Sequence, residues 1–518
     1  MEPVSEPLNI ASFFIDRHLA AGRGERTAFR FAGRSITYAD VAFAAAQAAG
    51  ALAELGVEIE NRVLFALEDS PAFAAAFWGT ARLGAVSVPV NTLMTAEEYA
   101  FVLNDSRARV AVVTPEVAAR LFVIRDRCPW LRAVLVVDGR APGRTLDWGE
   151  SLARAKPMTE PAHTGPEDVV YWGYTSGSTG RPKAAIHAHA DFVAAADLVG
   201  VGVFGLGPDD LVFSASKMFF AFGLGNSLYF PARVGAAAVL VPERITAERA
   251  FETIAAERPT VFMTVPTLWA RMLEIPDAEH RWDLSSLRYG VSSGEALPPA
   301  LFEAWADRFG LELVEVVGST EALHDFIANR PGEARAGTSG KVVPGFETRV
   351  VDDDGAAVPV GTVGHLLVKG ATTASGYWNR RERTRSTMLG EWLRTGDMFR
   401  QDADGWFYFE GRSDDMLKVA GQWVSPAEVE AHLVAHPAVL EAGVIGAADG
   451  RGLVVPCAYV VLKAERQASA ALATELRDFV RGRAAAFKAP ARIDFVADLP
   501  KTATGKIQRF RLRAPSPS

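Results

Sequence analysis

Cysteine is scarce in this sequence, with only Cys128 and Cys457 among 518 residues. The two lie far apart and form no CxxC pair, so they predict neither a disulfide framework nor a zinc site. Long apolar runs are missing too, because no uninterrupted apolar stretch reaches the ~20 residues that a membrane-spanning helix needs. We therefore interpret both cysteines as core thiols in a reducing compartment, with the cytoplasm as the expected location and no membrane contact.

Clustered positive charge is also missing. The net charge is −8, and the basic residues are scattered without a long run or an RNA-binding motif, which argues against a nucleic-acid partner. The N-terminal residues MEPVSEPLNI lack the basic and then apolar segments of a signal peptide, so we expect none. The length instead favours a globular protein of two or more domains.

Short apolar segments alternate with longer amphipathic ones in the first part of the chain. Four of them indicate buried strands: 62–69, 85–91, 109–115 and 133–139. Residues 70–84 and 116–129 between them indicate helices, and this alternation predicts an α/β fold of helix-covered parallel sheets. Residues 340–409, with turn residues at short intervals, predict antiparallel strands or a small β-barrel-like subdomain.

A domain boundary is expected near FEGRSDDML, residues 409–417. Beyond it, Ser425 and Glu428 predict a capping box at the start of a helix, with Pro426 at its first position. Three strand-like runs and a helix-like run over 468–487 complete a small α+β unit. We therefore predict an N-terminal domain over residues 1–411 and a C-terminal domain over residues 412–518.

The stretch YTSGSTGRPK, residues 174–183, concentrates small and hydroxyl residues ahead of one lysine. Its glycines permit unusual backbone conformations, and its amides and hydroxyls can wrap a phosphate chain. We expect it between a buried strand and a helix, where anion-binding loops are found. It is not a GxxxxGK[ST] loop, because Arg181 and Pro182 separate Gly180 from Lys183. A polar surface loop is the plain alternative.

This stretch resembles the phosphate loop of the adenylate-forming superfamily, which includes acyl-CoA and aryl-CoA ligases, adenylation domains and firefly-type luciferases. Further motifs follow in the family's order: SSGEAL (292–297), VGSTE (317–321), WLRTGD (392–397), GRSDDMLK (411–418) and PKTATGKIQR (500–509). The resemblance implies two half-reactions. A carboxylate attacks the α-phosphate of ATP, giving an acyl-adenylate and pyrophosphate, and a thiol, usually that of coenzyme A, then displaces AMP.

The same resemblance implies a nucleotide site. Its phosphate loop would comprise Thr175, Ser176, Gly177, Ser178, Thr179, Gly180 and Lys183. Thr320 would contact the α-phosphate and Glu321 would bind Mg²⁺, in keeping with a reaction that needs mainly positioning and charge stabilisation. The rest of the nucleotide site would be formed by Gly294, Glu295, Ala296, Gly318, Ser319, Asp397 and Arg412.

The resemblance also implies a mobile C-terminal domain. Lys506 matches the lysine that bridges the substrate carboxylate and the α-phosphate, where an ammonium offsets the repulsion between two anions. Lys501 fits an exposed tail lysine better. Asp414 matches a hinge position, in a loop that absorbs the backbone change. One domain orientation would deliver Lys506, and the other would form the pantetheine channel with the loop around Gly421.

Within the superfamily the chain looks most similar to benzoate-CoA ligases. Three stretches carry this likeness: KMFFAFGLGNSLYFP (217–231), GSTEALHDFIANRPG (318–332) and DDMLKVAGQWVSPAEVE (414–430). The first matches the acyl pocket and has no acidic residue for an amino-acid substrate, whereas its phenylalanines suit an aromatic ring. We assign Phe220, Phe222 and Gly223 to the pocket, interpret Phe219 as core, and place His324 at the pocket floor.

Asp325 stands where we expect an apolar residue more often. A carboxylate there leads to the hypothesis of a substituted benzoate whose amino group, as in anthranilate, or hydroxyl group binds Asp325. Loading of an aryl acid onto a carrier protein in trans is an open alternative, and a homodimer is common in the family. A non-catalytic nucleotide-binding module is disfavoured, because Lys506, Glu321 and Asp397 are all present.

Overall fold

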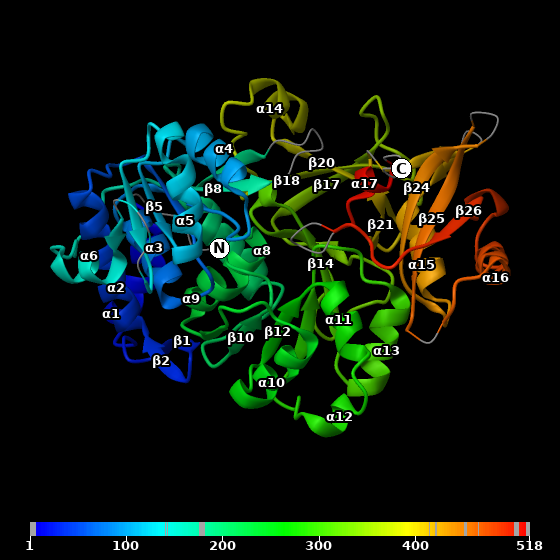
Figure 1. The fold of residues 1–518 in the computed structure, drawn as a ribbon, viewed down its shortest axis with the longest axis horizontal. Coiled ribbons are helices and arrows are strands. Elements are labelled where there is room, and N and C mark those ends of the chain that lie inside the picture. Colours follow the sequence, from blue (N-terminus) through cyan, green and yellow to red (C-terminus); the bar gives the residue numbers. More distant parts are fainter. Residues whose placement is uncertain are drawn as a thin grey trace.

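The computed structural model describes residues 7–139, 141, 143, 145–175, 182–413, 415–419, 422–449, 453–464, 466–501 and 507–513. The sheets in this part of the chain are two large ones, a smaller antiparallel one and, in the C-terminal part, a two-stranded and a three-stranded one (Figure 1). The fold is α/β with a large N-terminal part and a small C-terminal part, as the sequence predicts. Both cysteines are buried and free.

The first large sheet has seven strands. Their order is β7 (Leu146–Asp147), β6 (Ala133–Val136), β5 (Val110–Val113), β3 (Arg62–Ala66), β4 (Val86–Pro89), β8 (Val169–Thr175) and β9 (Lys183–Ala188). All neighbours pair in parallel except β8 and β9, which are antiparallel. The four strands expected over residues 62–139 are therefore confirmed, as are the helices between them.

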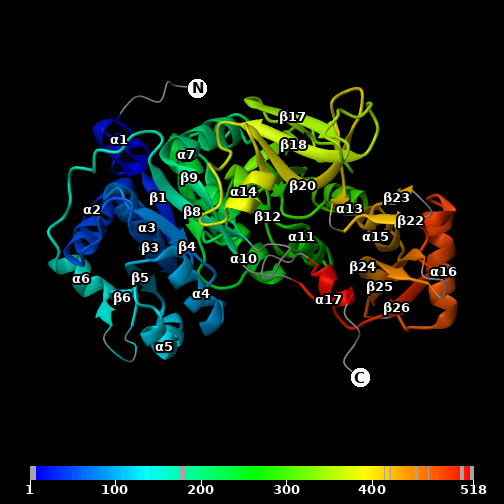
Figure 2. The same ribbon diagram turned by 90° about the horizontal axis from the view of Figure 1, so that it is seen from above.

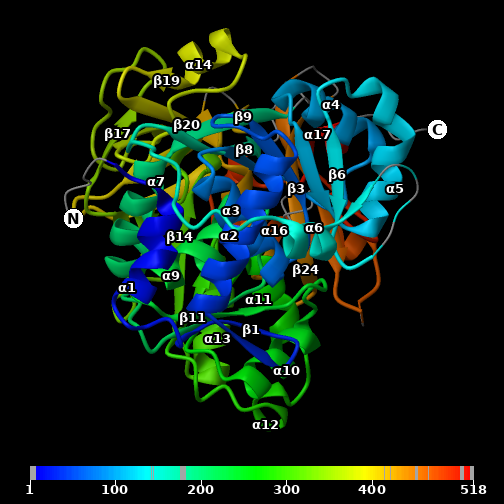
Figure 3. The ribbon, with the colours of Figure 1, turned by 90° about the vertical axis from the view of Figure 1, so that its left-hand side faces the viewer.

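Helices cover both faces of this sheet. Alternate residues of β3 and β5 point into two apolar clusters, one with α2 (Tyr38–Glu54) and α3 (Pro71–Arg82), the other with α4 (Ala96–Ser106) and α5 (Pro115–Ile124). Figure 3 shows the two helix pairs on opposite sides of the strands. Ser70 caps α3 by accepting a hydrogen bond from the Phe73 amide, with Pro71 at the first helical position, so local chemistry fixes where this helix begins.

The second large sheet has nine strands. Their order is β16 (Lys341–Val342), β15 (Asp325–Ala328), β14 (Leu313–Gly318), β13 (Tyr289–Ser292), β12 (Val261–Thr264), β10 (Leu211–Ser214), β11 (Ala237–Leu240), β1 (Thr27–Phe31) and β2 (Arg34–Thr37). Pairing is parallel from β14 to β1 and antiparallel at both edges. One face packs on α10 (Ala247–Glu257), α11 (Pro266–Leu273) and α13 (Pro299–Phe309).

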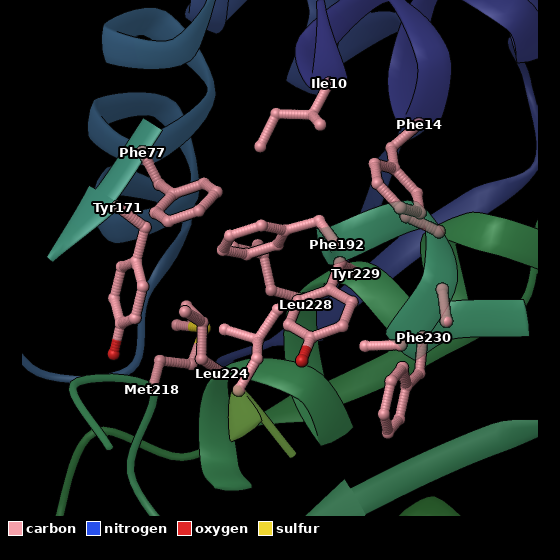
Figure 4. Close-up of a cluster of buried hydrophobic side chains, with 14 of the residues drawn as sticks. Ile10, Phe14, Phe77, Tyr171, Phe192, Met218, Leu224, Leu228, Tyr229 and Phe230 are labelled. Atoms are coloured by element: carbon pink, nitrogen blue, oxygen red, sulfur yellow. The ribbon is translucent and has the colours of Figure 1, made fainter. Parts of the chain in front are cut away.

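The other face of this sheet shares a central core with the first sheet. Phe192 of α7 (His189–Ala195) lies at its centre, with its ring centroid 4.9 Å from that of Tyr229 and 5.7 Å from that of Tyr171 on β8 (Figure 4). The segment with Tyr229 continues from α8 (Ala221–Leu224) into α9 (Phe230–Val234). Phe219, just before α8, is buried in the same core, which confirms its sequence interpretation.

A five-stranded antiparallel sheet follows, as predicted for residues 340–409. It comprises β17 (Phe346–Val351), β18 (Gly364–Gly370), β19 (Met388–Leu389), β20 (Trp392–Gln401) and β21 (Phe407–Arg412), with α14 (Arg381–Thr387) before β19. Strand β21 pairs with β20 up to Arg412, which lies opposite Asp397. The last strand of this sheet thus reaches one residue beyond the expected boundary at 411.

The C-terminal part has its own core around three strands. Its elements are β22 (Leu417–Val419), β23 (Gln422–Val424), α15 (Pro426–Val434), β24 (Val439–Ala448), β25 (Val454–Leu462), α16 (Ala470–Arg481), β26 (Arg492–Phe495) and α17 (Arg509–Arg513). Figure 2 shows it at the end of the molecule away from α2. Ser425 caps α15, but the Glu428 carboxylate binds Lys488 Nζ at 2.7 Å, so only half of the expected capping box is formed.

The remaining helical elements are short: Ser12–Asp16, α1 (Arg17–Ala20), Arg125–Arg127, α6 (Trp148–Arg154), Ala196–Val201, Gly225–Tyr229, α12 (Ala278–Arg281), Thr320–Ala322 and Ala486–Lys488. None of the helices in the described part of the chain combines the length and the apolar character that crossing a bilayer demands.

Candidate active site

The phosphate-loop motif joins two antiparallel strands. Thr175, the last residue of β8, lies opposite Lys183, the first residue of β9. The helix expected after the loop is present as α7, which begins at His189, but a strand that was not predicted, β9, lies between the loop and this helix. Residues 184–188 are mostly alanine, and so the alternation typical of a strand was hidden. The loop residues Ser176, Gly177, Ser178, Thr179 and Gly180 lie outside the described residues.

Lys183 and Glu321 meet in the structure although 138 residues separate them. The Lys183 ammonium lies 3.1 Å from Glu321 Oε1, and both side chains are nearly buried. Tyr377, which the sequence analysis did not single out, completes the group: its hydroxyl donates to Glu321 Oε1 at 2.7 Å and accepts from Lys183 Nζ. We call these three side chains the Lys–Glu–Tyr cluster.

Within the Lys–Glu–Tyr cluster, the Lys183 ammonium and the Tyr377 hydroxyl stabilise the ionised form of Glu321. Burial alone raises the pKa of Glu321, but the Lys183 ammonium and the Tyr377 hydroxyl outweigh it and hold that pKa below its usual value. Burial raises the pKa of Tyr377 far above its ordinary range, and the neighbouring Glu321 charge adds to this. Tyr377 therefore stays a hydrogen-bond donor, and Glu321 stays an anion.

Thr320, beside Glu321, is fixed by β8 and β9. His187 Nε2 lies 2.8 Å from the Thr320 carbonyl oxygen, and since a carbonyl can only accept, this nitrogen donates. Asp191 holds the other ring nitrogen at 3.0 Å. A β-carbon on Gly173 would lie 2.4 Å from the Thr320 methyl group, so glycine permits the close approach. Neither His187 nor Gly173 was predicted.

A tight turn connects Glu321 with His324. The His324 amide donates to the Ala322 carbonyl at 2.7 Å, which closes a γ-turn centred on Leu323. Leu323 has φ 63° and ψ −40°, a conformation that a branched side chain adopts only under strain. The turn directs Glu321 toward Lys183 and His324 toward the acyl-pocket segment.

Two residues assigned to the nucleotide form an ion pair across β20 and β21. Arg412 Nη1 lies 2.7 Å from Asp397 Oδ1, and Asp397 is the less exposed partner. A bidentate acceptor and a guanidinium in one place suit a ligand with hydroxyl and phosphate groups. The motif spacing therefore identified two side chains that do meet in space.

The other nucleotide residues follow neighbouring parallel strands. Gly294 follows β13, and Gly318 ends β14, so both lie at the carboxyl edge of the sheet, where α/β proteins bind ligands. Gly294 has φ 89°, which favours glycine. Glu295 accepts a hydrogen bond from Thr267 of α11 at 3.3 Å, whereas Ala296 is exposed. Ser319 directly follows Gly318 and precedes Thr320.

His324 lies against the predicted acyl-pocket segment. Its ring centroid is 5.5 Å from that of Phe222, and its Nε2 is 3.3 Å from the Phe222 carbonyl. Phe220 and Phe222 are partly exposed, unlike Phe219. Gly223 does not leave room for a ligand as expected, because a β-carbon there would lie 2.2 Å from the Lys217 carbonyl oxygen. Backbone fills that space.

Asp325 contacts His324 rather than open space. Its Oδ2 lies 2.9 Å from His324 Nδ1, and the two side chains are 2% and 1% exposed. Gly225 lets the ring approach, because a β-carbon there would lie 2.4 Å from His324 Cδ2. Asp325 thus reaches the pocket through His324, and its binding of a ring substituent stays a hypothesis.

Lys506, Asp414 and Gly421 lie outside the described residues. The chain on both sides of residues 502–506 is anchored: Lys501 pairs with Glu441, and Arg509 lies 2.7 Å from Glu430. Lys501 is only 18% exposed, so its interpretation as an exposed tail lysine is wrong.

Comparison with known proteins gives a consistent result. A family model described as AMP-binding enzyme matches residues 16–378, and one described as AMP-binding enzyme C-terminal domain matches residues 428–506. The benzoate–CoA ligase of Thauera aromatica is 44% identical over 99% of this chain and 97% of that protein.

Two solved structures extend the comparison. The anthranilate CoA ligase AuaEII, in complex with anthranoyl-AMP, has a TM-score of 0.94 at 42% identity, over 99% of this chain and 97% of that one. A benzoate CoA ligase from Burkholderia xenovorans LB400 has a TM-score of 0.91 at 41% identity, over 98% of this chain and 100% of that one.

Proposed function

Because this chain belongs to the family of AMP-binding enzymes, we propose that it activates an aromatic carboxylic acid with ATP and transfers the acyl group to coenzyme A. It is an AMP-forming acid–thiol ligase. The observation that carries the proposal is the 44% identity with a benzoate–CoA ligase along nearly the whole length of both chains.

In the first half-reaction, a carboxylate oxygen of the acid bonds to the α-phosphorus of ATP. The bond from that phosphorus to the β-phosphate breaks, and pyrophosphate leaves with the electron pair. Lys183 and the loop residues 175–180 are proposed to hold the β- and γ-phosphates, and Thr320 the α-phosphate. Lys506 is proposed to bridge the two reacting anions and so reduce their repulsion.

Glu321 is the proposed protein ligand of Mg²⁺. Magnesium is commonly bound by one or two carboxylates together with substrate phosphates, and an ionised, nearly buried Glu321 beside the phosphate lysine fits that requirement. When bound, the ion would supply charge neutralisation on the phosphates. The described residues include no cluster of three or more histidine, cysteine, aspartate or glutamate side chains suited to another metal.

The nucleoside is proposed to bind across the sheet edge. Asp397 would accept hydrogen bonds from the ribose hydroxyls, and its partner Arg412 would close on the ribose or a phosphate. The adenine site is proposed to be lined by Gly294, Glu295, Ala296, Gly318 and Ser319.

In the second half-reaction, the thiol sulfur of coenzyme A attacks the acyl carbon, and AMP leaves. We propose that residues 412–518 reorient about Asp414 for this step and that the loop around Gly421 lines the pantetheine channel. Transfer to a carrier protein is not favoured, because the benzoate and anthranilate relatives are named CoA ligases.

The acid is proposed to be benzoate or a substituted benzoate. Phe220 and Phe222 suit the faces and edges of an aromatic ring, and the His324–Asp325 pair lies beside Phe222. Gly223 belongs to this segment through its backbone. The cytoplasm remains the predicted location.

Pyrophosphate release tests the function. The protein is supplied with Mg-ATP and benzoate, 2-aminobenzoate, hydroxybenzoates, cinnamate, hexanoate or phenylalanine, with and without coenzyme A. Release with benzoate-type acids and sustained turnover only with coenzyme A are expected. Adenylation without use of coenzyme A would indicate a carrier acceptor, and a response only to hexanoate or phenylalanine would refute the aryl pocket.

A further inference from the structure

We propose that Tyr377 is a positioning residue of the metal–nucleotide site, which holds the Glu321 carboxylate in place while Lys183 exchanges Glu321 for the phosphates of ATP. This inference rests on the proposed use of Glu321 and Lys183. It adds a residue that belongs to none of the motifs from which the site was predicted.

The backbone around Tyr377 is hydrogen-bonded to β9, the strand that follows the phosphate-loop motif. Residues 375–378 run along β9: the Ser375 amide donates to the Ile186 carbonyl at 3.1 Å, the Ile186 amide to the Gly376 carbonyl at 3.1 Å, and the Trp378 amide to the Ala184 carbonyl at 3.0 Å. Tyr377 thus lies beside the strand that begins at Lys183.

The next side chain fixes the segment further. The Trp378 ring lies 4.6 Å from the Trp172 ring of β8, and its indole N–H donates to the Asp105 carbonyl at 2.8 Å. Arg380 pairs with the Asp105 carboxylate at 2.9 Å. Tyr377 is 5% exposed. A tyrosine held in this way can define the position of another group.

The hydroxyl of Tyr377 uses both of its hydrogen-bonding functions within the cluster. Its hydrogen goes to Glu321 Oε1 and its oxygen accepts from Lys183, whose ammonium also lies 3.8 Å from the centre of the tyrosine ring. Both the Lys183 and the Tyr377 contact fall on Oε1, and Oε2 takes part in neither of them. A carboxylate held through one oxygen keeps a defined orientation for a ligand at the other.

The cluster also requires an exchange of cations. The single positive charge of Lys183 cannot offset Glu321 and the several negative charges of the ATP phosphates together, so we propose that a divalent cation takes its place beside the carboxylate. During this exchange the Tyr377 contact need not break, because a neutral hydroxyl has no charge to be displaced. Removing the hydroxyl should therefore weaken the metal-dependent part of nucleotide binding selectively.

Isothermal titration calorimetry without any acid tests this, since no adenylate forms. The wild type, Tyr377→Phe and the control Tyr408→Phe are titrated with ATP in the presence of Mg²⁺ and, separately, of EDTA. Tyr377→Phe keeps the ring over Lys183. Tyr408, near the start of β21, donates to Asp402 at 3.0 Å and contacts no member of the Lys–Glu–Tyr cluster in any hydrogen bond between described residues. Melting temperatures establish that each variant is folded.

We expect Tyr377→Phe to bind MgATP about tenfold more weakly, the usual effect of one hydrogen bond to a charged group, while its affinity for metal-free ATP changes by less than about threefold. Tyr408→Phe should match the wild type. Equally weakened binding of MgATP and metal-free ATP, or unchanged binding of both, would overturn the inference. A wild type that binds MgATP but adenylates no aryl acid would refute the proposed function alone.

Discussion

Some of the charged side chains of this site are buried, and each of these is stable there only because a partner of opposite charge lies beside it. Lys183 and Glu321 are 12% and 14% exposed, so each is an unfavourable buried ion without the other. The side chains of His324 and Asp325 are buried more completely, at 1% and 2% exposed, and lie 2.9 Å apart. A substitution that removes one partner should therefore lower the free energy of unfolding, because the remaining charge stays buried without its counter-charge.

Lys183→Met should destabilise the free protein by about 3 kcal/mol near neutral pH, because it leaves the Glu321 carboxylate buried without its cation. The pKa of Glu321 is lowered in the folded wild type, so the stability it contributes is present above the unfolded pKa of about 4.3 and is lost as the pH falls through the folded value. The difference in melting temperature between wild type and variant should thus be largest at pH 6–8 and narrow at lower pH. A difference that does not change with pH would contradict the pairing.

Asp325→Asn should alter the choice between acids more than the reaction itself. If Asp325 acts on an amino or hydroxyl substituent through His324, the ratio of kcat/KM for 2-aminobenzoate to that for benzoate should fall by about tenfold, since the carboxylate 2.9 Å from His324 Nδ1 is removed. Pyrophosphate release measures both values. An unchanged ratio would refute the hypothesis, and Asp353→Asn on an exposed turn is the control.

The motifs assigned Lys183 and Glu321, and also Asp397 and Arg412, to one nucleotide, but they did not predict that these side chains contact each other directly. They did not predict Tyr377, His187 or Leu323. A tyrosine after an apolar strand indicates core packing, and the contact of Tyr377 with Lys183 spans 194 residues. The strain at Leu323 has no sequence signal, because leucine gives no indication of a positive φ.

Most residues of the site lie on strands or directly after them rather than on helices. Strand β14 is one of these strands, and it includes a buried acidic residue. It contains Glu315, which is 4% exposed and accepts a hydrogen bond from Ser339 at 3.1 Å. Burial raises the pKa of Glu315 to about 8. This side chain is therefore neutral at pH 7, three residues before Gly318 at the nucleotide edge.

Glu315→Gln should stabilise the protein increasingly as the pH rises. The raised pKa means that the wild type gains full stability from Glu315 only below the unfolded pKa of about 4.3 and loses it progressively up to pH 8. The difference in unfolding free energy should thus grow between pH 5 and 8, toward about 5 kcal/mol, and then level off. Urea unfolding at several pH values measures it, and a constant difference would show that Glu315 is ionised throughout.

Elements with a clear hydrophobic period were predictable, and elements of small residues were not. In the strands over residues 62–139, successive side chains point to opposite buried faces. The sequence analysis identified the bounds of these strands to within a few residues. Strand β9 consists largely of alanine, which suits helix and strand alike, and its pairing with β8 decides the outcome. Pairing with a distant strand is information that a local pattern does not contain.

At the scale of the whole molecule, the N-terminal part carries the described site, and the C-terminal part carries Lys506. Arg509 connects three segments of that part, since it pairs with Glu430 on α15 and lies 3.4 Å from Asp415 beside the proposed hinge. The chain on the C-terminal side of Lys506 is thereby tied to the domain that is expected to move as a unit.

Lys506→Ala should separate the two half-reactions. Adenylation should slow by at least about a hundredfold, because the charge between two anions is removed, whereas transfer from a synthetic aryl-adenylate to coenzyme A should keep its rate. Lys463→Ala removes an exposed charge from the same domain and serves as the control. Equal loss in both half-reactions would mean that Lys506 supports the domain rather than the chemistry.

The fold class, the antiparallel subdomain and the small C-terminal unit all followed from the order of patterns along the chain. The way the first two sheets share one core did not, because Tyr171, Phe192 and Tyr229 come from segments with unrelated periods. The boundary expected near residues 409–417 stays a prediction, and β21 extends to Arg412 through its pairing with β20.

The antiparallel attachment of the phosphate loop has a practical consequence for protein engineering. Thr175 and Lys183 lie opposite each other, so the segment between them leaves and re-enters the sheet at one rung. A loop closed in this way can change in length at little entropic cost while both strands keep their register. Versions of this segment from other ligases can therefore be grafted between the same two residues, which would allow binding of the triphosphate to be altered independently of the choice of acid.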